Sequence, residues 1–318
     1  MCTTGVLRFA DGGYALFKNK DFGRSHLDDR IWLDAAVFGV LGMTTWAGDD
    51  PANDEYSGFS IGANEYGVLC CDSNVVTLDG HVNYDVMTEV ALSEGTDVAS
   101  AIEAIRAAVA EALTSWGNLL LIDADAAASV EIRGREVAIV PLDRPTARSN
   151  HHVVLGHHQL QEDHATTDLR LASAQRRVAT AERLSDVYDL LASHDDGSTG
   201  VCNHLSSLTT VYSYVLSCHG GRTALDVLQG LPCSGAERVH LDIPFGAGCD
   251  LDSIEQFLQT YPSATKQIRA RPIVDQAIGL AAVNWVRTVL LDRSGTARRH
   301  NARMPTGSAA GSSLRERR

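Results

Sequence analysis

The sequence predicts an α+β protein in which antiparallel sheets and helices form layers. Three observations favour this fold class: strand-like segments occur in pairs around short turns, two longer segments have helical spacing of apolar residues, and β-rich and helical regions alternate along the chain. Because the paired segments are hairpins and not regular βαβ units, a doubly wound parallel sheet is not expected.

The first hairpin is expected in "GVLRFADGGYALFKNKDF", where Asp11, Gly12 and Gly13 lie between two β-rich arms. The glycines can adopt the positive φ that tight hairpin turns need. A second pair of strands is expected in "FSIGANEYGVLCCDSNVV", with its polar turn at residues 64–67.

Helices are expected next, over Thr88–Leu113, which is alanine-rich and has apolar residues at helical spacing. Gly95 should divide this region into two helices, with Thr96 or Asp97 as the N-cap of the second. The segment "GNLLLIDADAAASVEIRGREVAIVPL" then predicts three strands joined by turns.

A second helical region is predicted over Thr166–Leu191, followed by an alternating hairpin that turns at Gly220 and Gly221. With 318 residues, 44% of them hydrophobic, the chain can bury a large core, and we expect one domain over residues 2–291. From Asp292 onward Arg, Gly, Ser and Ala dominate, which predicts a disordered basic tail over residues 292–318.

The composition excludes some classes of function. A net charge of −13 argues against a nucleic-acid-binding protein, because neutralising phosphates requires clustered Lys and Arg. A small molecule is the more natural partner. The apolar runs fall short of the roughly 20 residues that cross a bilayer, so the sequence predicts a cytoplasmic protein without a membrane partner. We also expect a homo-oligomer.

No cofactor and no metal site are expected. The seven cysteines are scattered without CxxC spacing, which argues against a zinc ribbon and against a disulfide framework. The segment "HHVVLGHHQLQEDH" contains five histidines, but consecutive pairs on a strand point to opposite faces. A pocket rim or a surface loop is therefore the expected role of this segment.

The opening "MCTT" places a cysteine at position 2, and aminopeptidases remove Met1 when the second residue is small. Cys2 would then carry both a thiol and a free α-amine, whose ordinary pKa of about 7.7–8.0 lets it accept a proton near neutral pH. Asp21 can fold back beside Cys2 across the hairpin and orient the amine, while Lys18 or Arg24 could stabilise a thiolate or bind a substrate anion. An incidental cysteine at a flexible terminus is the alternative interpretation.

The segment "MCTTGVLRFADGGYALFKNKD" resembles the N-terminus of the N-terminal-nucleophile (Ntn) cysteine hydrolases of the penicillin V acylase and bile salt hydrolase (choloylglycine hydrolase) family. It is also similar to the mature start of isopenicillin N acyltransferases. The resemblance covers roughly Cys2–Pro244. It continues, in the family's order, through "GANEYGVLCCDSN", "GNLLLIDADAAASVEI", "RSNHH", "SAQRRVATAERL" and "LQGLPC".

The resemblance implies an αββα four-layer sandwich, the Ntn-hydrolase fold, with one pair of helices on each side. It also implies that Cys2 is the nucleophile and, through its amine, the base. Asp21 would hold the amine, and Asn150 would donate its side-chain N–H to the oxyanion, with Asn74 as a second candidate donor.

An arginine is also implied beside Asp21 and Cys2. Arg176 in "SAQRR" is the residue that matches, with Arg170 and Arg177 as alternatives. Bile salt hydrolases have arginine where this chain has Lys18, which cannot bind a carboxylate in a bidentate manner. This departure disfavours bile acids as substrates.

The reaction implied is attack of Cys2 on a linear amide carbonyl to give a thioester. Water would complete it in an amidohydrolase, and an amine would complete it in an acyltransferase of secondary metabolism. A catalytically inactive binding protein is the alternative from another class.

Overall fold

The structure, a computed structural model, describes residues 2–22, 29, 31–43, 56–75, 85–111, 115–156, 161–195, 200–205 and 208–262. The strands are β1 Cys2–Arg8, β2 Tyr14–Phe22, β3 Ile31–Leu33, β4 Val37–Met43, β5 Tyr56–Asn64, β6 Leu69–Asn74, β7 Ser115–Ile122, β8 Ala127–Gly134, β9 Glu136–Pro141, β10 Thr146–Arg148, β11 His204–Leu205, β12 Leu208–His219, β13 Arg222–Gln229 and β14 Val239–Asp242. The helices are α1 Asp85–Glu94, α2 Val98–Glu111, α3 Gln161–Val178, α4 Leu184–Leu191 and α5 Leu251–Thr260, with short 3₁₀ turns η3 Pro232–Ser234 and η4 Gly246–Gly248.

The described strands form two seven-stranded antiparallel sheets. The first has the order β10-β1-β2-β12-β13-β14, with β11 paired to β12, and the second runs β3-β4-β5-β6-β7-β8-β9. Neighbours in the second sheet are also neighbours in the chain. In the first sheet, by contrast, β1 and β2 lie between β10 and β12, strands from much later in the chain, so residues far apart in sequence meet there.

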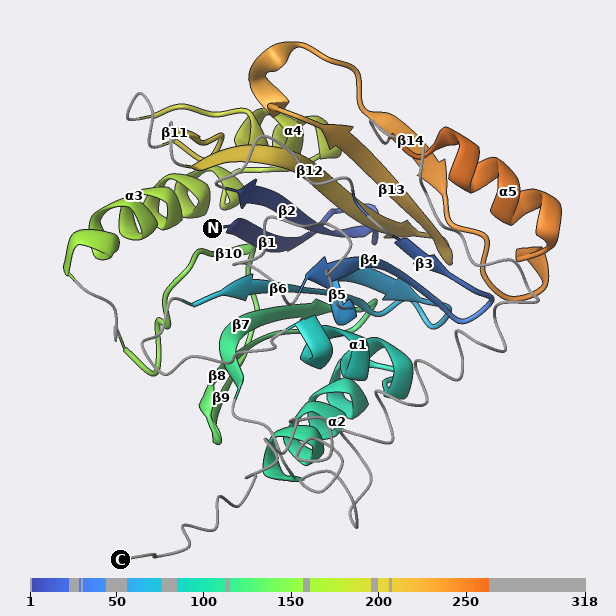
Figure 1. Cartoon of the computed structure of the whole chain (residues 1–318), viewed down its shortest axis with the longest axis horizontal. Coiled ribbons are helices and arrows are strands. Elements are labelled where there is room, and N and C mark those ends of the chain that lie inside the picture. The colour runs from blue at the N-terminus through green and yellow to red at the C-terminus, as the bar shows by residue number, and fades with distance from the viewer. Residues whose placement is uncertain are drawn as a thin grey trace, which may run out of the picture.

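Three apolar clusters separate four layers (Figure 1). The cluster between the two sheets contains Leu16 and Tyr214 from one sheet and Ile61 from the other. A second cluster joins α1 and α2 to the second sheet, and a third joins α3 and α4 to the first sheet through residues such as Phe17. Because adjacent residues of a strand point to opposite faces, Leu16 packs between the sheets while Phe17 packs under the helices. The αββα arrangement expected from the sequence is confirmed.

The local elements also agree with the sequence patterns. The predicted turn of the first hairpin joins β1 to β2, with Gly12 at φ 86°, and the turn after β12 has Gly220 and Gly221 at φ 57° and 76°. Gly95 separates α1 from α2. The Asp97 carboxylate accepts the Ser100 N–H at 2.7 Å, which is the N-cap contact expected at the start of α2.

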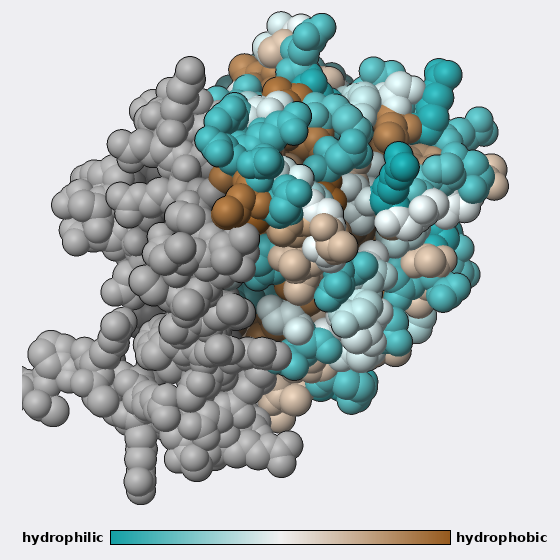
Figure 2. Space-filling view, turned by 90° about the vertical axis from the view of Figure 1, so that its right-hand side faces the viewer, coloured by the Kyte–Doolittle hydropathy of each residue, from teal (hydrophilic) through white to brown (hydrophobic). Residues whose placement is uncertain are grey.

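Several elements were not anticipated. β3, β4, β10, β11, β14 and α5 are short or lie outside the strongly patterned segments. The predicted domain end at 291 and the predicted tail over 292–318 both lie outside the described residues. None of the described helices is both long and apolar enough to cross a lipid bilayer. On the face that includes α5, apolar residues occur as small groups among hydrophilic ones (Figure 2).

Candidate active site

Cys2 is the first residue of β1, and it lies where three parts of the fold meet. β1 pairs with β2 on one side, with Cys2 opposite Lys20, and with β10 on the other, with Thr4 opposite Arg148. This end of β1 lies next to α3 (Figure 1). Cys2 is only 8% exposed, and its backbone nitrogen donates to Asn150 Oδ1 at 2.8 Å. The predicted nucleophile and the predicted oxyanion residue are therefore in contact.

Asn150 lies in the loop after β10, and this loop is fixed by side chains from the second sheet. The Asn118 carboxamide donates to the carbonyl oxygens of Ser149 and His151, at 3.0 Å each. The Glu131 carboxylate accepts three successive backbone N–H groups, those of residues 153–155, at 2.8–2.9 Å. Neither Asn118 nor Glu131 was among the site residues expected from the sequence.

Helix α3 holds the same loop from the other side. The Asn150 backbone N–H donates to Thr167 Oγ1 at 2.9 Å, and the Ser149 hydroxyl lies 2.8 Å from the same oxygen. Thr167 and Arg170 are three residues apart, so they lie on one face of the helix. This face of α3 is the one turned toward Cys2.

Arg170 is the arginine of this site. Its side chain is 1% exposed, and its guanidinium donates to the Cys2 carbonyl at 2.7 Å, to Thr3 Oγ1 at 3.2 Å and to Asn150 Oδ1 at 2.8 Å. Burial lowers the pKa of Arg170, and the Asp21 carboxylate and the Cys2 thiol oppose that change. Arg170 therefore fixes the backbone of Cys2 and the side chain of Asn150 together.

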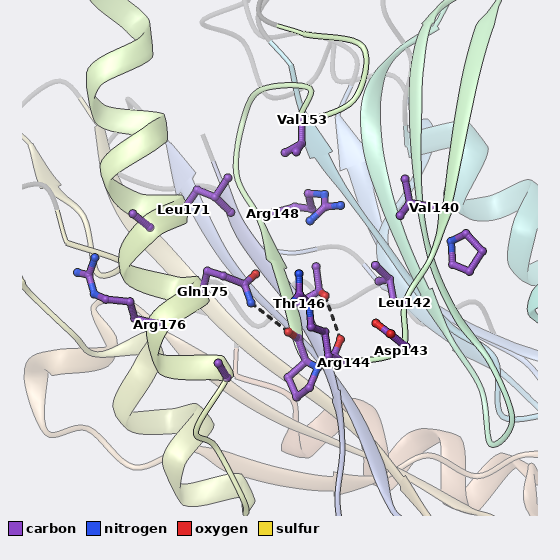
Figure 3. Close-up of a pocket in the computed structure, with 14 residues that line it drawn as sticks. Val140, Leu142, Asp143, Arg144, Thr146, Arg148, Val153, Leu171, Gln175 and Arg176 are labelled. Carbon is purple, nitrogen blue, oxygen red and sulfur yellow. Dashed lines mark hydrogen bonds between the residues drawn. The ribbon is translucent and has the colours of Figure 1, made fainter.

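The prediction that Arg176 occupies this position is wrong. The Arg176 guanidinium is 64% exposed and lies 3.1 Å from the Asp195 carboxylate. Figure 3 shows its side chain extending from α3 on the side away from β10, whereas Leu171 and Gln175 point toward that strand. Arg177, the other alternative, also pairs with Asp195. The motif match therefore selected the correct helix, α3, but a residue nearly two helical turns after Arg170.

Asp21 is buried near the end of β2, between Arg170 and β12. Its Oδ2 lies 3.9 Å from the Arg170 guanidinium, and its Oδ1 accepts the Thr210 hydroxyl at 2.7 Å. The register between β2 and β12 shifts between Thr210 and Tyr212, and such a bulge re-aims the neighbouring side chains. Burial raises the pKa of Asp21, while Arg170 and Thr210 act to lower it. We call Cys2, Asp21, Asn150 and Arg170 the Cys2 centre.

Lys18 does not belong to that contact network, although Cys2 interacts with it electrostatically. Its ammonium lies between the sheets and contacts Ser60 O at 2.9 Å, Ser60 Oγ at 2.6 Å, Asp72 O at 2.9 Å and Asp72 Oδ1 at 3.0 Å. Burial acts to lower the pKa of Lys18, but the Asp72 carboxylate more than compensates, so this pKa is raised.

An ammonium has three N–H donors, and these acceptors engage all of them. Substrate binding by Lys18 stays a prediction, and we call Lys18 and Asp72 the Lys18 pair. The other predicted substrate-binding residue, Arg24, lies outside the described residues.

Asn74 contacts the Cys2 centre through its backbone. Its carbonyl accepts the Asn150 Nδ2–H at 2.6 Å. A carboxamide nitrogen carries two hydrogens, and this bond uses one of them. The two asparagines expected near the oxyanion are thus neighbours, and donation by either to an oxyanion stays a prediction.

We expected the histidine segment to form a pocket rim or a surface loop. The two histidines whose side chains the structure describes are instead buried. His151 and His152 are 4% and 1% exposed. His151 Nδ1 lies 3.0 Å from Thr167 Oγ1, and the His152 ring stacks on Trp116 with centroids 6.1 Å apart. Residues 157 and 158, and the side chain of residue 164, lie outside the described part.

A cavity of about 800 Å³ lies between α3 and the β9–β10 connection (Figure 3). Val140, Leu142, Arg148, Leu171 and Gln175 are among its lining residues, and none of the lining residues is a member of the Cys2 centre. The cavity borders the outer side of β10, so it is adjacent to the centre without including the thiol.

Comparisons with known proteins gave matches among solved structures. These include a variant of conjugated bile acid hydrolase from Clostridium perfringens, 14% identical with a TM-score of 0.42 over 76% of this chain and 92% of that one. Penicillin V acylase from Agrobacterium tumefaciens is 12% identical, with a TM-score of 0.46 over 76% and 86% of the two chains. The Caenorhabditis elegans orthologue of N-acylethanolamine-hydrolyzing acid amidase is 11% identical, with a TM-score of 0.46 over 68% and 92%.

Two of these proteins carry the names of the hydrolases that the N-terminal motif resembles. No family model and no curated protein matches the chain. At these identities and TM-scores the matches assign neither a substrate nor residue roles. Any function proposed for this chain therefore depends on the contacts within the Cys2 centre.

Proposed function

We propose that this protein, once Met1 has been removed, is an N-terminal cysteine amidohydrolase that cleaves a linear C–N amide bond of a small acylated molecule. One observation carries the proposal: the Cys2 nitrogen is held 2.8 Å from Asn150 Oδ1, and Arg170 binds both that oxygen and the Cys2 carbonyl. Loss of Met1 turns this nitrogen into an amine that is already oriented.

The chemistry follows from the two groups on Cys2. The neutral amine accepts the thiol proton, and the sulfur attacks the substrate carbonyl carbon. When the tetrahedral intermediate collapses, the C–N bond breaks and the ammonium returns its proton to the leaving amine, which yields a thioester. Water then attacks the thioester, giving the free acid and restoring the thiol.

The surrounding charges suit these steps. Cys2 interacts electrostatically with the buried cations Lys18 and Arg170, which can stabilise negative charge that develops during the reaction. Asp21, buried beside Arg170, supplies the negative charge that favours the ammonium form of the amine. In this proposal Asn150 orients the amine through Oδ1, and its carboxamide nitrogen, near Asn74, is the donor for the oxyanion.

The cytoplasm is the proposed compartment, because aminopeptidases that remove an initiating methionine act there on new chains. Neutral or cationic acyl amides are the proposed substrates. The net charge of −13 disfavours anionic conjugates such as bile acids, although Lys18 no longer supports this argument because its ammonium is engaged by Asp72 and Ser60.

The test begins with the intact mass of the purified protein, which should correspond to a chain that starts at Cys2. Amide cleavage is then measured with penicillin V, an N-acylethanolamine and a conjugated bile acid as substrates, each with and without an added amine acceptor. Release of free acid supports a hydrolase, and a new amide with the added amine supports an acyltransferase. A protein that retains Met1 and still cleaves these amides would contradict the mechanism.

A further inference from the structure

Four side chains outside the Cys2 centre converge on one point of the described structure. They are His194, Cys202, His204 and Cys233, and one nitrogen or sulfur atom from each lies within 4.8 Å of all the others. His204 Nε2 is 3.1 Å from Cys233 Sγ and 3.4 Å from Cys202 Sγ. The rings of His194 and His204 have centroids 4.8 Å apart.

Three separate parts of the chain bring these residues together. His194 follows the end of α4, Cys202 and His204 lead into β11, and Cys233 lies in the turn η3 after β13. In Figure 1, α4 and β11 lie side by side, at the end of the first sheet. No local spacing motif links the four positions, which explains why no metal site was expected from the sequence.

The turn at Asn203 fixes two of the ligands. Its N–H donates to Thr210 Oγ1 at 2.9 Å, and its Oδ1 accepts the Leu205 N–H at 3.0 Å. Cys202 and His204 flank Asn203, and His204 Nε2 lies 3.4 Å from Cys202 Sγ. The hydrogen bonds of Asn203 thus fix the segment that carries both side chains.

The distances match a tetrahedral zinc site. Zinc binds cysteine sulfur at about 2.3 Å and histidine nitrogen at about 2.0–2.1 Å, which places neighbouring ligand atoms about 3.3–3.8 Å apart. The two N···S distances, 3.1 and 3.4 Å, lie close to that range, and the whole set spans no more than 4.8 Å.

The donor chemistry also favours zinc. Two thiolates balance the charge of a divalent ion, and two Cys with two His is a standard donor set for structural zinc. Cys202 is buried, while His194, His204 and Cys233 are exposed, so an ion can enter from solvent. Four protein ligands leave no open coordination position, which indicates a structural and not a catalytic ion.

We infer that His194, Cys202, His204 and Cys233 bind a structural zinc ion. The ion would fasten α4, the β11 segment and η3 to one another. It would also steady Asp21, because Thr210 Oγ1 accepts the Asn203 N–H and donates to the Asp21 carboxylate at 2.7 Å. The metal site would therefore stabilise the position of the Asp21 side chain in the Cys2 centre, through the hydrogen bonds of Asn203 and Thr210.

Metal analysis of the protein purified without chelator tests this inference directly. We expect about one zinc per chain, the stoichiometry of a four-ligand structural site. After removal of zinc, cobalt(II) should restore a stoichiometric complex with the visible absorption of tetrahedral cobalt and a thiolate-to-metal charge-transfer band. These readouts do not depend on amidase activity, so failure of the metal site and failure of the proposed reaction can be told apart.

Matched variants locate the site. Cys233→Ser and His204→Ala should abolish stoichiometric zinc and the cobalt spectrum, whereas Cys249→Ser and His219→Ala, which alter a cysteine and a histidine elsewhere, should retain both. A chelator should lower the Tm of the wild type and of the two controls but not the Tm of Cys233→Ser.

Two results would overturn the inference. One is a wild-type protein that contains no zinc and gives no tetrahedral cobalt spectrum. The other is a disulfide between Cys202 and Cys233, found by mass spectrometry of the unreduced protein, since oxidised sulfur cannot bind the ion.

Discussion

The Cys2 centre and the Lys18 pair are two buried ionic groups built on the same strand, and they are organised differently. In the Lys18 pair the cation lies 3.0 Å from its carboxylate. In the Cys2 centre the Arg170 guanidinium lies 3.9 Å from Asp21 and makes its shorter contacts, at 2.7 and 2.8 Å, with the Cys2 carbonyl and Asn150. Lys18 and Asp21 are three residues apart on β2, so they point to opposite faces, one between the sheets and one under the helices.

The difference separates a structural ion pair from the group that we propose to be reactive. The Lys18 ammonium contacts Ser60 and Asp72 of the second sheet, so it joins the two sheets. Arg170 instead holds uncharged oxygens in place, and the charges of Asp21 and Arg170 remain near the nitrogen and sulfur of Cys2. The predictions below change one group at a time to test this distinction.

The largest effect is expected for Cys2. Cys2→Ala removes the nucleophile and should lower kcat by on the order of 10⁴-fold or more while leaving the protein folded. Cys2→Ser keeps the shape but is a much weaker nucleophile with only an amine as its base. Turnover and circular dichroism are the measurements, with Cys249→Ser as the matched control that should remain active. Substantial activity in Cys2→Ala would place the reactive centre elsewhere.

Breaking the Lys18 pair should affect stability. Lys18→Met leaves Asp72 buried without its cation, and removing one partner of a buried pair costs about 3–5 kcal/mol in the free energy of unfolding. Denaturant unfolding measures this loss, and the double variant Lys18→Met/Asp72→Asn should recover part of it. If Lys18→Met kept its stability but raised KM, the prediction of a substrate-binding Lys18 would be supported.

The Lys18 pair also predicts a pH dependence. The pKa of Lys18 is raised in the folded protein, so its stabilising contribution is complete below the unfolded-state pKa of about 10.4 and is lost as the pH rises through the folded-state value. The difference in Tm between the wild type and Lys18→Met should therefore shrink above about pH 10.4. A difference that already changes near neutral pH would point to another titrating group.

A smaller effect on activity is expected for Arg170→Lys, which keeps the charge but cannot donate to the Cys2 carbonyl and Asn150 in the same fixed geometry. The displaced amine should lower kcat/KM by about 10²-fold. Arg176→Lys, on the same helix, is the matched control and should match the wild type. Equal losses in the two variants would remove the basis for assigning Arg170 to the site.

The smallest effect is expected for Arg176→Ala. This side chain is 64% exposed in its pair with Asp195, and exposed ion pairs contribute less than about 1 kcal/mol. Both the free energy of unfolding and kcat/KM should stay close to the wild type. A loss of activity here would contradict the structural placement of this residue on the outer side of α3.

The sequence predicted those features that local chemistry determines. Glycine turns and apolar spacing located the main hairpins and helices, and the N-terminal motif located Cys2 and Asp21 on adjacent strands. The choice of Arg170 over Arg176 depends on how α3 is rotated, and this is set by the contact of Thr167 with the Asn150 loop, which has no local signal. The metal ligands and Asn118 likewise act across elements that are far apart in the chain.

The burial of Cys2 has a consequence for how the chain is made. Asn150 and Arg170, which enclose Cys2, follow it by 148 and 168 residues. Ribosomes add about 5–20 residues per second, so Cys2 and Met1 emerge roughly 10–30 s before the segments that cover them exist. An aminopeptidase can reach the terminus during that interval, whereas in the finished fold Cys2 is only 8% exposed. In the proposed mechanism, Met1 is therefore removed while the chain is still being translated, before Asn150 and Arg170 cover the terminus.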